Sequence, residues 1–393
     1  MQVCLGPVAQ TAFWGLFVLL ALAAAPRLGA VYYLAQDGDD RNAGNREAPW
    51  RSIEKANAAL RPGDTAIFRP GTYEGRLAPA SGGEPGSPIV FRSEEVHEAV
   101  LVGGERGHLV VELDGTDHVV LEGFRVSPGD GRWLRAEDCD GLTIRGCYME
   151  RAGHRGTSLS ITRCGNVRLI DNVFKRDYPV GNMCNLIGCT YVVVEGNAFT
   201  RVGHCPLLLD TVNFAVVRGN CFHNCWGRNY ELWASGRVLV EGNVITEALD
   251  SARSADTRAK NVLIDSIIRF NRAFGNRHTP MDSPSYMPRM TWTPHIRDPF
   301  RLVNTRIYHN TITDNLGYGW DLWGINVSAN VFVNNVFCRN DPYGSGVQIT
   351  ITESVVGDNR FFNNLLRGTA DGQRTLRRGK TFMTAEEANE KSP

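Results

Sequence analysis

One short pattern recurs through the middle of the chain at nearly constant spacing. Alternating apolar residues lead to Gly or Asp and then to a fixed position that is most often Asn, as in VRLIDNVF, VVVEGNAF, AVVRGNCF and RVLVEGNVI. A period this long and this regular is typical of proteins built from stacked repeats. The fixed position falls, at intervals of 25, 25, 23, 23 and 23 residues, on Cys147, Asn172, Asn197, Asn220, Asn243 and Ser266.

The content of each repeat predicts the fold. Two or three short β-branched runs are separated by Gly, Asn or Asp, and no helical periodicity accompanies them. One such coil cannot bury its own inward face, so successive coils must stack, at about 4.8 Å per coil. We therefore expect an all-β protein, a right-handed parallel β-helix with about 23–25 residues per coil. The asparagines at the fixed position are expected to form a structural ladder.

The N-terminus has the features of a secretory signal peptide, which we assign to residues 1–30. Residues 12–25 are apolar and uncharged, and small residues follow as far as Ala30. An uncleaved membrane anchor is the alternative. A signal peptide predicts a secreted protein, extracellular or periplasmic, that has no membrane contact after cleavage.

The rest of the chain is assigned to one β-helix domain, residues 31–366, followed by a polar C-terminal tail, residues 367–393, with a possible short helix at 384–391. Within the domain, residues 52–60 predict a helix with Ser52 as N-cap, which would cap the N-terminal end of the solenoid. Residues 275–302 interrupt the repeat and are rich in Pro, Met and aromatic residues. We expect them to form a flap over a cleft, or else a contact in an oligomer whose state the sequence leaves open.

The net charge and the cysteine spacing limit which partners and which disulfides we expect. The 42 Lys and Arg residues balance the 42 Asp and Glu residues, which argues against a nucleic-acid partner. Cys139, Cys164 and Cys189 each lie eight residues before a fixed position. They should therefore stack in one column, and we expect free, buried thiols there because three stacked cysteines cannot all pair.

Residues 32–75, with YYLAQDGDDRNAG and APWRSIEKANAALRPGDTAIFRPGTYEG, and VVLEGF at 119–124 resemble the entry region of pectin-lyase-like β-helix proteins. Secreted polysaccharide lyases of the alginate lyase/chondroitinase B and pectate lyase types belong to this group. The resemblance implies a polysaccharide substrate. In the alginate lyase/chondroitinase B group a strand glutamate precedes a catalytic lysine. Glu231 could match the glutamate, but Gly236 or Arg237 stands where the lysine is expected.

Counting backward from the fixed position predicts an outward face on the preceding strand. Positions ten and twelve residues before it should face solvent, because side chains alternate along a strand. They collect Asp210, Glu231, Trp233 and Asp256 on one face, with Asn185 beside them, and Asp321-Leu322-Trp323 repeats the motif in a later coil. An exposed indole can stack on a sugar ring, so Trp233 and Trp323 are candidate substrate contacts.

The carboxylates allow two kinds of chemistry. Asp210 and Asp256, two coils apart, should lie about 9–10 Å from each other, near the upper end of the range for an inverting hydrolase. Alternatively, Glu231 and Asp256 could bind Ca²⁺. An ordinary solvated sheet face is the alternative to either function.

The connections after the repeat strands add a basic rim, which suits an anionic chain such as a uronate polymer. Histidine or arginine there could act as the base of a β-elimination, and a cation could neutralise the sugar carboxylate. An ordinary polar edge is the alternative. The candidate bases and acids are Asp210, Glu231, Asp256, His204, Arg258 and Lys260, and the candidate substrate contacts on the rim are His154, Arg176, Arg228 and His278.

These features predict a secreted carbohydrate-active enzyme that cleaves an acidic polysaccharide, with lyase chemistry preferred. A β-helix glycoside hydrolase with paired carboxylates is the first alternative. A non-catalytic carbohydrate-binding protein and a structural or adhesive solenoid are the others.

Overall fold

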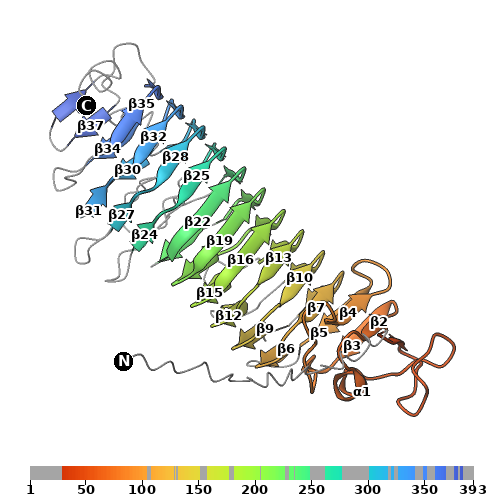
Figure 1. The fold of residues 1–393 in the computed structure, drawn as a ribbon. Coiled ribbons are helices and arrows are strands. Elements are labelled where there is room, and N and C mark those ends of the chain that lie inside the picture. Colours follow the sequence, from red (N-terminus) through yellow and green to blue (C-terminus); the bar gives the residue numbers. More distant parts are fainter. Residues whose placement is uncertain are drawn as a thin grey trace, which may run out of the picture.

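The computed structural model describes residues 29–103, 108–127, 129, 132–150, 157–176, 181–203, 205–225, 230–233, 235–247, 262–276, 301–316, 320–322, 326–340, 348–351, 359–368, 376–378 and 381–383. For some of these, Glu231 and Trp233 among them, only the backbone is described. The chain forms an elongated parallel β-solenoid, which confirms the predicted all-β fold (Figure 1).

Three sheets, here called A, B and C, run along the solenoid, and each complete coil passes through C, A and B in turn. Sheet A contains β1 (Val31–Leu34), β2 (Thr65–Phe68), β4 (Ile89–Ser93), β7 (Val119–Glu122), β10 (Thr143–Arg145), β13 (Arg168–Ile170), β16 (Thr190–Glu195), β19 (Asn213–Arg218), β22 (Ser235–Glu241), β24 (Val262–Ile264), β25 (Ile267–Arg269), β27 (Arg301–Val303), β28 (Arg306–Tyr308), β31 (Asn326–Ser328), β32 (Val331–Val333) and β35 (Arg360–Phe362).

Sheet B contains β3 (Gly71–Glu74), β5 (Ala99–Val102), β8 (Arg125–Ser127), β11 (Tyr148–Glu150), β14 (Val173–Lys175), β17 (Ala198–Thr200), β20 (Cys221–His223), β23 (Val244–Thr246), β26 (Arg272–Phe274), β29 (Thr311–Thr313), β33 (Val336–Cys338) and β36 (Leu365–Arg367). Sheet C contains β6 (Leu109–Asp114), β9 (Arg132–Glu137), β12 (Leu159–Thr162), β15 (Asn182–Ile187), β18 (Cys205–Asp210) and β21 (Glu231–Trp233). A fourth sheet contains β30 (Trp320–Leu322), β34 (Ile349–Ile351), β37 (Leu376–Arg378) and β38 (Thr381–Met383).

An asparagine ladder lines the corner between sheets A and B. Asn197 shows the repeating unit: its backbone N–H donates to Asn220 Oδ1 at 2.9 Å, and its Nδ2 donates to the same oxygen at 3.0 Å and to the Leu169 carbonyl at 2.8 Å. Because these groups are buried, the ladder satisfies polar atoms that water cannot reach. The ladder role predicted for the asparagines is confirmed from Asn172 to Asn243.

The predicted ladder position at Ser266 is wrong. Asn243 donates instead to Asn271, 28 residues farther along, and Ser266 Oγ accepts from the backbone N–H of Val238. Ser266 therefore lies between β24 and β25 of sheet A, in the column where the earlier coils turn from sheet C into sheet A. We call this column the corner between sheets C and A, and it has its own inward polar side chains. The coil after Asn243 is longer than the period of 23 used to locate Ser266.

The core is a continuous apolar column between the sheets. Phe174, Phe199 and Phe222 stack in successive coils with ring centroids 4.8 and 5.0 Å apart, and all three side chains are completely buried. The inward positions of sheet C are filled by Ile161, Leu186, Leu209 and Leu232, which are also completely buried. This burial confirms the alternation from which the outward face was predicted.

The N-terminal end of the solenoid carries the one helix of the described residues, α1 (Ile53–Ala59) (Figure 1). Ser52 is its N-cap, as predicted, and Ser52 Oγ accepts from the backbone N–H of Lys55 at 3.1 Å. Ile53, Ala56 and Leu60 join the hydrophobic core. That the helix caps the solenoid stays a prediction. No helix of the described residues is long and apolar enough to span a membrane.

The two other predicted segments are only partly described. Asn276 belongs to a second asparagine ladder through Asn315, and Leu302 lies in β27, so the loop predicted at 275–302 is shorter than expected. Residues 277–300 lie outside the described residues, as do 1–28 and 384–393. The C-terminal tail is not separate from the fold, because β37 pairs with β34 and β38 returns antiparallel to β37.

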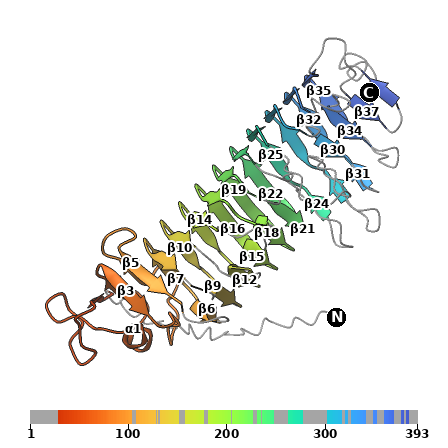
Figure 2. The same cartoon turned by 180° about the vertical axis from the view of Figure 1, so that it is seen from behind.

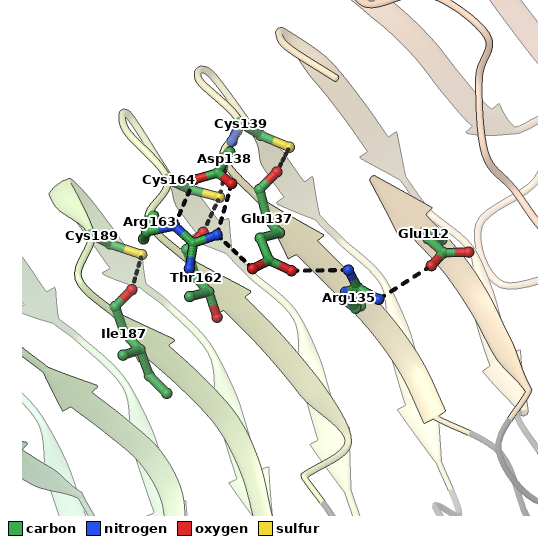
Figure 3. Close-up of polar contacts among 10 residues, drawn as sticks. All are labelled: Glu112, Arg135, Glu137, Asp138, Cys139, Thr162, Arg163, Cys164, Ile187 and Cys189. Atoms are coloured by element: carbon green, nitrogen blue, oxygen red, sulfur yellow. Dashed lines mark hydrogen bonds and ion pairs between the residues drawn. The ribbon is translucent and has the colours of Figure 1, made fainter. Parts of the chain in front are cut away.

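The cysteine column has the predicted arrangement. Cys139, Cys164 and Cys189 are buried and free, and the backbone N–H of Cys139 lies 3.4 Å from Cys164 Sγ. Each thiol donates to the carbonyl two residues before it, on Glu137, Thr162 and Ile187 respectively (Figure 3).

Candidate functional site

Sheet C brings the predicted outward positions into register. Its six strands lie side by side along one wall of the solenoid (Figure 2). In the pairing of β18 with β21, Asp210 lies opposite Trp233 and Leu208 lies opposite Glu231. Asn185 lies opposite Leu208 on the other side. The sequence count therefore placed Asp210, Glu231, Trp233 and Asn185 correctly relative to one another.

The connections that vary most in length border this sheet. Between sheets A and B the chain turns in two residues, as at Gly196 and Asn197, in every described coil except between β4 and β5, where residues 94–98 connect the strands. Between sheets B and C the connections have different lengths, as at 128–131, 151–158, 176–181, 201–204 and 224–230. Variable connections beside a regular wall are where binding and catalytic residues usually occur.

Asp210 ends β18 with a half-exposed side chain. Its Oδ1 accepts a hydrogen bond from Thr211 Oγ1 at 2.9 Å, and its carbonyl accepts from the backbone N–H of Gly188. No described basic residue forms an ion pair with it. The carboxylate is therefore available to a ligand on the outer face of sheet C.

At the other end of sheet C, the charged side chains are paired with one another. Arg135 lies between Glu112 and Glu137, at 3.6 and 2.9 Å, and Arg163 pairs with Glu137 at 2.5 Å and with Asp138 at 2.7 Å (Figure 3). Hydrogen bonds from these guanidinium groups lower the pKa of Glu137 and of Asp138. These charges neutralise one another, which makes Asp210 the better candidate for chemistry.

Leu208 departs from the expected solvent-exposed position. It occupies the outward column, yet its side chain is only 4% exposed. Its neighbours in the column are Asn185 and Glu231. Because Leu208 is covered, the prediction that its position faces solvent is wrong, and the exposed candidates in these coils are the residues on either side of it.

Asn185 is held in place by its neighbours. Its Oδ1 accepts from Asn182 Nδ2 at 2.9 Å, and its Nδ2 donates to Thr157 Oγ1 at 3.0 Å. Because both ends of the Asn185 amide are hydrogen-bonded, it is a fixed polar group at the edge of the candidate site.

Arg176 is not the rim residue that the sequence predicted. Its side chain is completely buried, and its guanidinium donates to the Asn182 carbonyl at 2.9 Å and to Ser158 Oγ at 3.2 Å. A buried guanidinium needs such acceptors, because transferring a charged group from water to the interior without hydrogen-bond partners costs free energy. Arg176 therefore supports the start of β15 instead of contacting a substrate.

Several candidates fall outside the described residues. These are His154, His204, Arg228, Asp256, Arg258, Lys260, His278 and Trp323. For Asp256 the counting itself was wrong, because it started from Ser266 and the ladder residue of that coil is Asn271. The predicted alignment of Asp256 with Asp210 is therefore wrong.

Within the described part of the chain, no three His, Cys, Asp or Glu side chains are grouped closely enough to hold a metal ion. The two candidate Ca²⁺ ligands, Glu231 and Asp256, are not covered by that search. A calcium site stays a prediction.

Sequence reasoning missed three residues at the corner between sheets C and A. Tyr191 and Phe214 are exposed and stack with ring centroids 5.1 Å apart, and the Arg237 guanidinium lies 5.1 Å from the Phe214 ring. All three precede a ladder asparagine by the same number of residues, so the repeat count could have found them.

The class of protein follows from this geometry: the chain has the parallel β-helix fold of pectin-lyase-like proteins. No family model matches it. A 77-residue stretch is 36% identical to the uncharacterized protein YwoF of Bacillus subtilis (strain 168). That stretch covers 20% of this chain and 16% of YwoF, so the match spans less than a fifth of that relative.

Solved structures share the fold at low identity. A GH136 lacto-N-biosidase from Eubacterium ramulus is 12% identical and superposes with a TM-score of 0.56, over 89% of this chain and 68% of that one. A mannuronic acid specific polysaccharide family 6 lyase from human gut microbiota is 15% identical, with a TM-score of 0.52 over 81% of each chain. The Streptococcus pneumoniae adhesin PfbA is 12% identical, with a TM-score of 0.53 over 80% of this chain and 91% of PfbA.

Proposed function

We propose that this protein is a carbohydrate-active enzyme that cleaves an acidic polysaccharide bound along the outer face of sheet C. The observation that carries the proposal is the register of β18 and β21, which sets Asp210 opposite Trp233 and Glu231 two residues before Trp233. Carboxylates provide acid–base chemistry, and an indole provides a surface on which a sugar ring stacks. The shared fold of a polysaccharide lyase and a lacto-N-biosidase supports it.

Lyase chemistry is the preferred form of the proposal. In β-elimination a base removes the proton next to the uronate carboxylate, the bond to the leaving oxygen breaks, and a carbon–carbon double bond forms as that oxygen gains a proton. His204, Arg258 and Lys260 are the candidate bases named from the sequence. Arg237 supports an anionic substrate, because it is exposed and forms no ion pair with a described carboxylate.

Hydrolysis is the second candidate, and the two carboxylate positions favour it. Asp210 and Glu231 belong to neighbouring strands and lie two residues apart in register, so their backbones are about 8 Å apart. Inverting glycosidases use two carboxyl groups about 6.5–9.5 Å apart. Here one residue would protonate the leaving oxygen and the other would activate water.

A Ca²⁺ requirement belongs to the proposal, with Glu231 as the candidate ligand, because the count that set Asp256 beside it was wrong. Carboxylate oxygens are the ligands that Ca²⁺ prefers. Secretion belongs to it as well, and N-terminal sequencing of the exported protein tests the predicted cleavage after Ala30.

The test is a screen of the purified protein against alginate, pectate, glycosaminoglycans and neutral glycans, with and without a chelator. Ultraviolet absorbance of unsaturated uronates indicates a lyase, whereas new reducing ends without that absorbance indicate a hydrolase. Asp210→Asn should lower turnover by about 10²-fold or more while substrate still binds. Asp114→Asn is the matched control, because Asp114 occupies the same outward column four strands away in β6.

Wild-type turnover in Asp210→Asn would remove Asp210 from the mechanism. Binding without any cleavage by the wild-type protein would instead support a non-catalytic carbohydrate-binding solenoid.

A further inference from the structure

The corner between sheets C and A places one residue per coil in the left-handed backbone region. The φ values along this column lie between 49° and 74°. Register pairs on both sides of the corner show that these residues stack in successive coils. The column consists of His118, Gly141, Asn166, Tyr191, Phe214, Arg237, Asp265, Asn304 and Ala329.

Four of the nine coils fill this position with Gly, Asn or Asp. Gly, Asn and Asp adopt positive φ at little cost, whereas bulky side chains there are uncommon. The large residues Tyr191, Phe214 and Arg237 are consecutive in the column. They occupy the same three coils as Ile187, Asp210 and Trp233, each four residues farther along the chain.

The core does not explain these side chains. Tyr191 is 57% exposed and Phe214 is 45% exposed, so they add little to the buried interior. Asn166 and Asn304 occupy the same position in other coils, so the fold does not require an aromatic residue there. Backbone strain retained without a packing benefit occurs preferentially at functional positions.

The three side chains form one surface along the solenoid axis. The Tyr191 and Phe214 rings are nearly parallel, at 13°, and the Arg237 guanidinium covers the Phe214 ring. Upstream, the Asn166 amide is directed toward Asp140, to whose Oδ1 it donates at 2.7 Å. Phe214 is the one ring partner of Tyr191 among the described residues.

We propose that Tyr191, Phe214 and Arg237 form an accessory binding site for a uronate-containing saccharide. Phe214 is stacked between Tyr191 and Arg237, so the uncovered face of Tyr191 and the ring edges contact the apolar face of a sugar, and the exposed guanidinium pairs with its carboxylate. The proposal rests on the proposed function, because the site would extend the same bound chain from sheet C around the corner. Four residues span at most about 14 Å, so a bound chain can contact Asp210 and Phe214 together.

A second aromatic pair provides an internal comparison. Phe270 and His309 stack at 5.2 Å and 13° at the corner between sheets A and B, and Phe270 is 49% exposed. The guanidinium over Phe270 belongs to Arg269, which is already paired with Glu241 at 2.6 Å. This pair therefore has a similar ring stack on the same left-handed backbone, but its arginine is already paired and it does not lie beside sheet C.

The experiment compares Tyr191→Asn, Phe214→Asn, their double variant and Arg237→Gln with Phe270→Asn as the control. Titration calorimetry measures binding of oligomannuronate, oligogalacturonate and a neutral xylo-oligosaccharide, and kinetics measure KM on the cleaved polymer. The double variant should bind about tenfold more weakly and show a raised KM. Arg237→Gln should weaken binding of the two uronates only, and Phe270→Asn should bind like wild type.

Stability separates this role from a structural one. Asn suits positive φ, so Tyr191→Asn and Phe214→Asn should unfold at the wild-type temperature or above. A lower unfolding temperature in both these and the corresponding glycine variants would assign the rings to folding and overturn the proposal. Unchanged affinity in the double variant of a protein that cleaves uronates would overturn the accessory site alone. If the wild-type protein neither binds nor cleaves any of these saccharides, the proposed function fails and the accessory site with it.

Discussion

Asp210 and Trp233 lie directly opposite each other in the parallel pairing of β18 and β21. They are 23 residues apart in the chain, which is one coil of the solenoid in this region. Their proximity therefore depends on the coil length. The ladder contact between Asn220 and Asn243, at the corner between sheets A and B, fixes that length.

Replacing Trp233 tests whether this column binds a sugar. Trp233→Ala should raise KM at least tenfold on the cleaved polysaccharide, because the stacking surface is removed. Trp233→Phe keeps an aromatic face and should show a smaller change. Equal KM values for wild type and Trp233→Ala would place the substrate elsewhere.

The ion pairs around Arg163 predict a pH-dependent contribution to stability. Arg163 lowers the pKa of Glu137 and of Asp138 in the folded protein. A lowered folded-state pKa stabilises the native state above the unfolded pKa, and this contribution is lost as pH falls through the folded-state pKa. Arg163→Gln should therefore lower the melting temperature at pH 7, and the difference from wild type should shrink as the pH falls below about 4.

Arg168→Gln is the matched control, because Arg168 is exposed on sheet A and forms no ion pair with a described residue. Its difference from wild type should stay small across the same pH range. If Arg163→Gln lowered the melting temperature by the same amount at every pH, the packing of the Arg163 side chain would matter more than its charge.

Replacing Asn220 tests how much the asparagine ladder contributes to the free energy of unfolding. Its side chain accepts from the backbone N–H of Asn197 and donates to the Val194 carbonyl, each at 2.9 Å, and it is 1% exposed. Asn220→Ala leaves both groups buried without a partner, at about 1–3 kcal/mol each. Denaturant unfolding should show a loss of about 3 kcal/mol or more. A loss below about 1 kcal/mol would mean that water enters the corner.

The repeat made the fold and the register of sheet C predictable. A constant spacing between polar ladder residues fixes how coils stack, and alternation then fixes which side chains face out, as with Leu209 between Leu208 and Asp210. The error at Ser266 has a physical origin. Both corners begin with a residue at positive φ followed by an inward polar residue, so Asp265-Ser266 resembles Asp171-Asn172 in sequence.

Burial was harder to predict than register. Arg176 follows a strand and looks like a polar rim residue, yet Ser158 and the Asn182 carbonyl satisfy its guanidinium inside the fold. Those acceptors belong to other segments and cannot be assigned from the neighbouring sequence. Tyr191 and Phe214 were missed for the opposite reason, because apolar residues in a strand-rich segment suggest a core.

The cysteine column predicts unusually inert thiols for a protein expected to be secreted. Cys139, Cys164 and Cys189 are at most 2% exposed, and each donates to a carbonyl of its own coil (Figure 3). Burial also raises the pKa of Cys189, which disfavours the reactive thiolate. The hydrogen bond with Cys164 instead lowers the pKa of Cys139 to about 7, so the inertness expected of Cys139 rests on its burial. A thiol reagent should leave these three cysteines unlabelled in the folded protein and label them within minutes in denaturant. Mass spectrometry of the unreduced protein should find all three as free thiols. A Cys139–Cys164 disulfide would contradict this, and would show that stacked thiols in neighbouring coils oxidise before the solenoid closes around them.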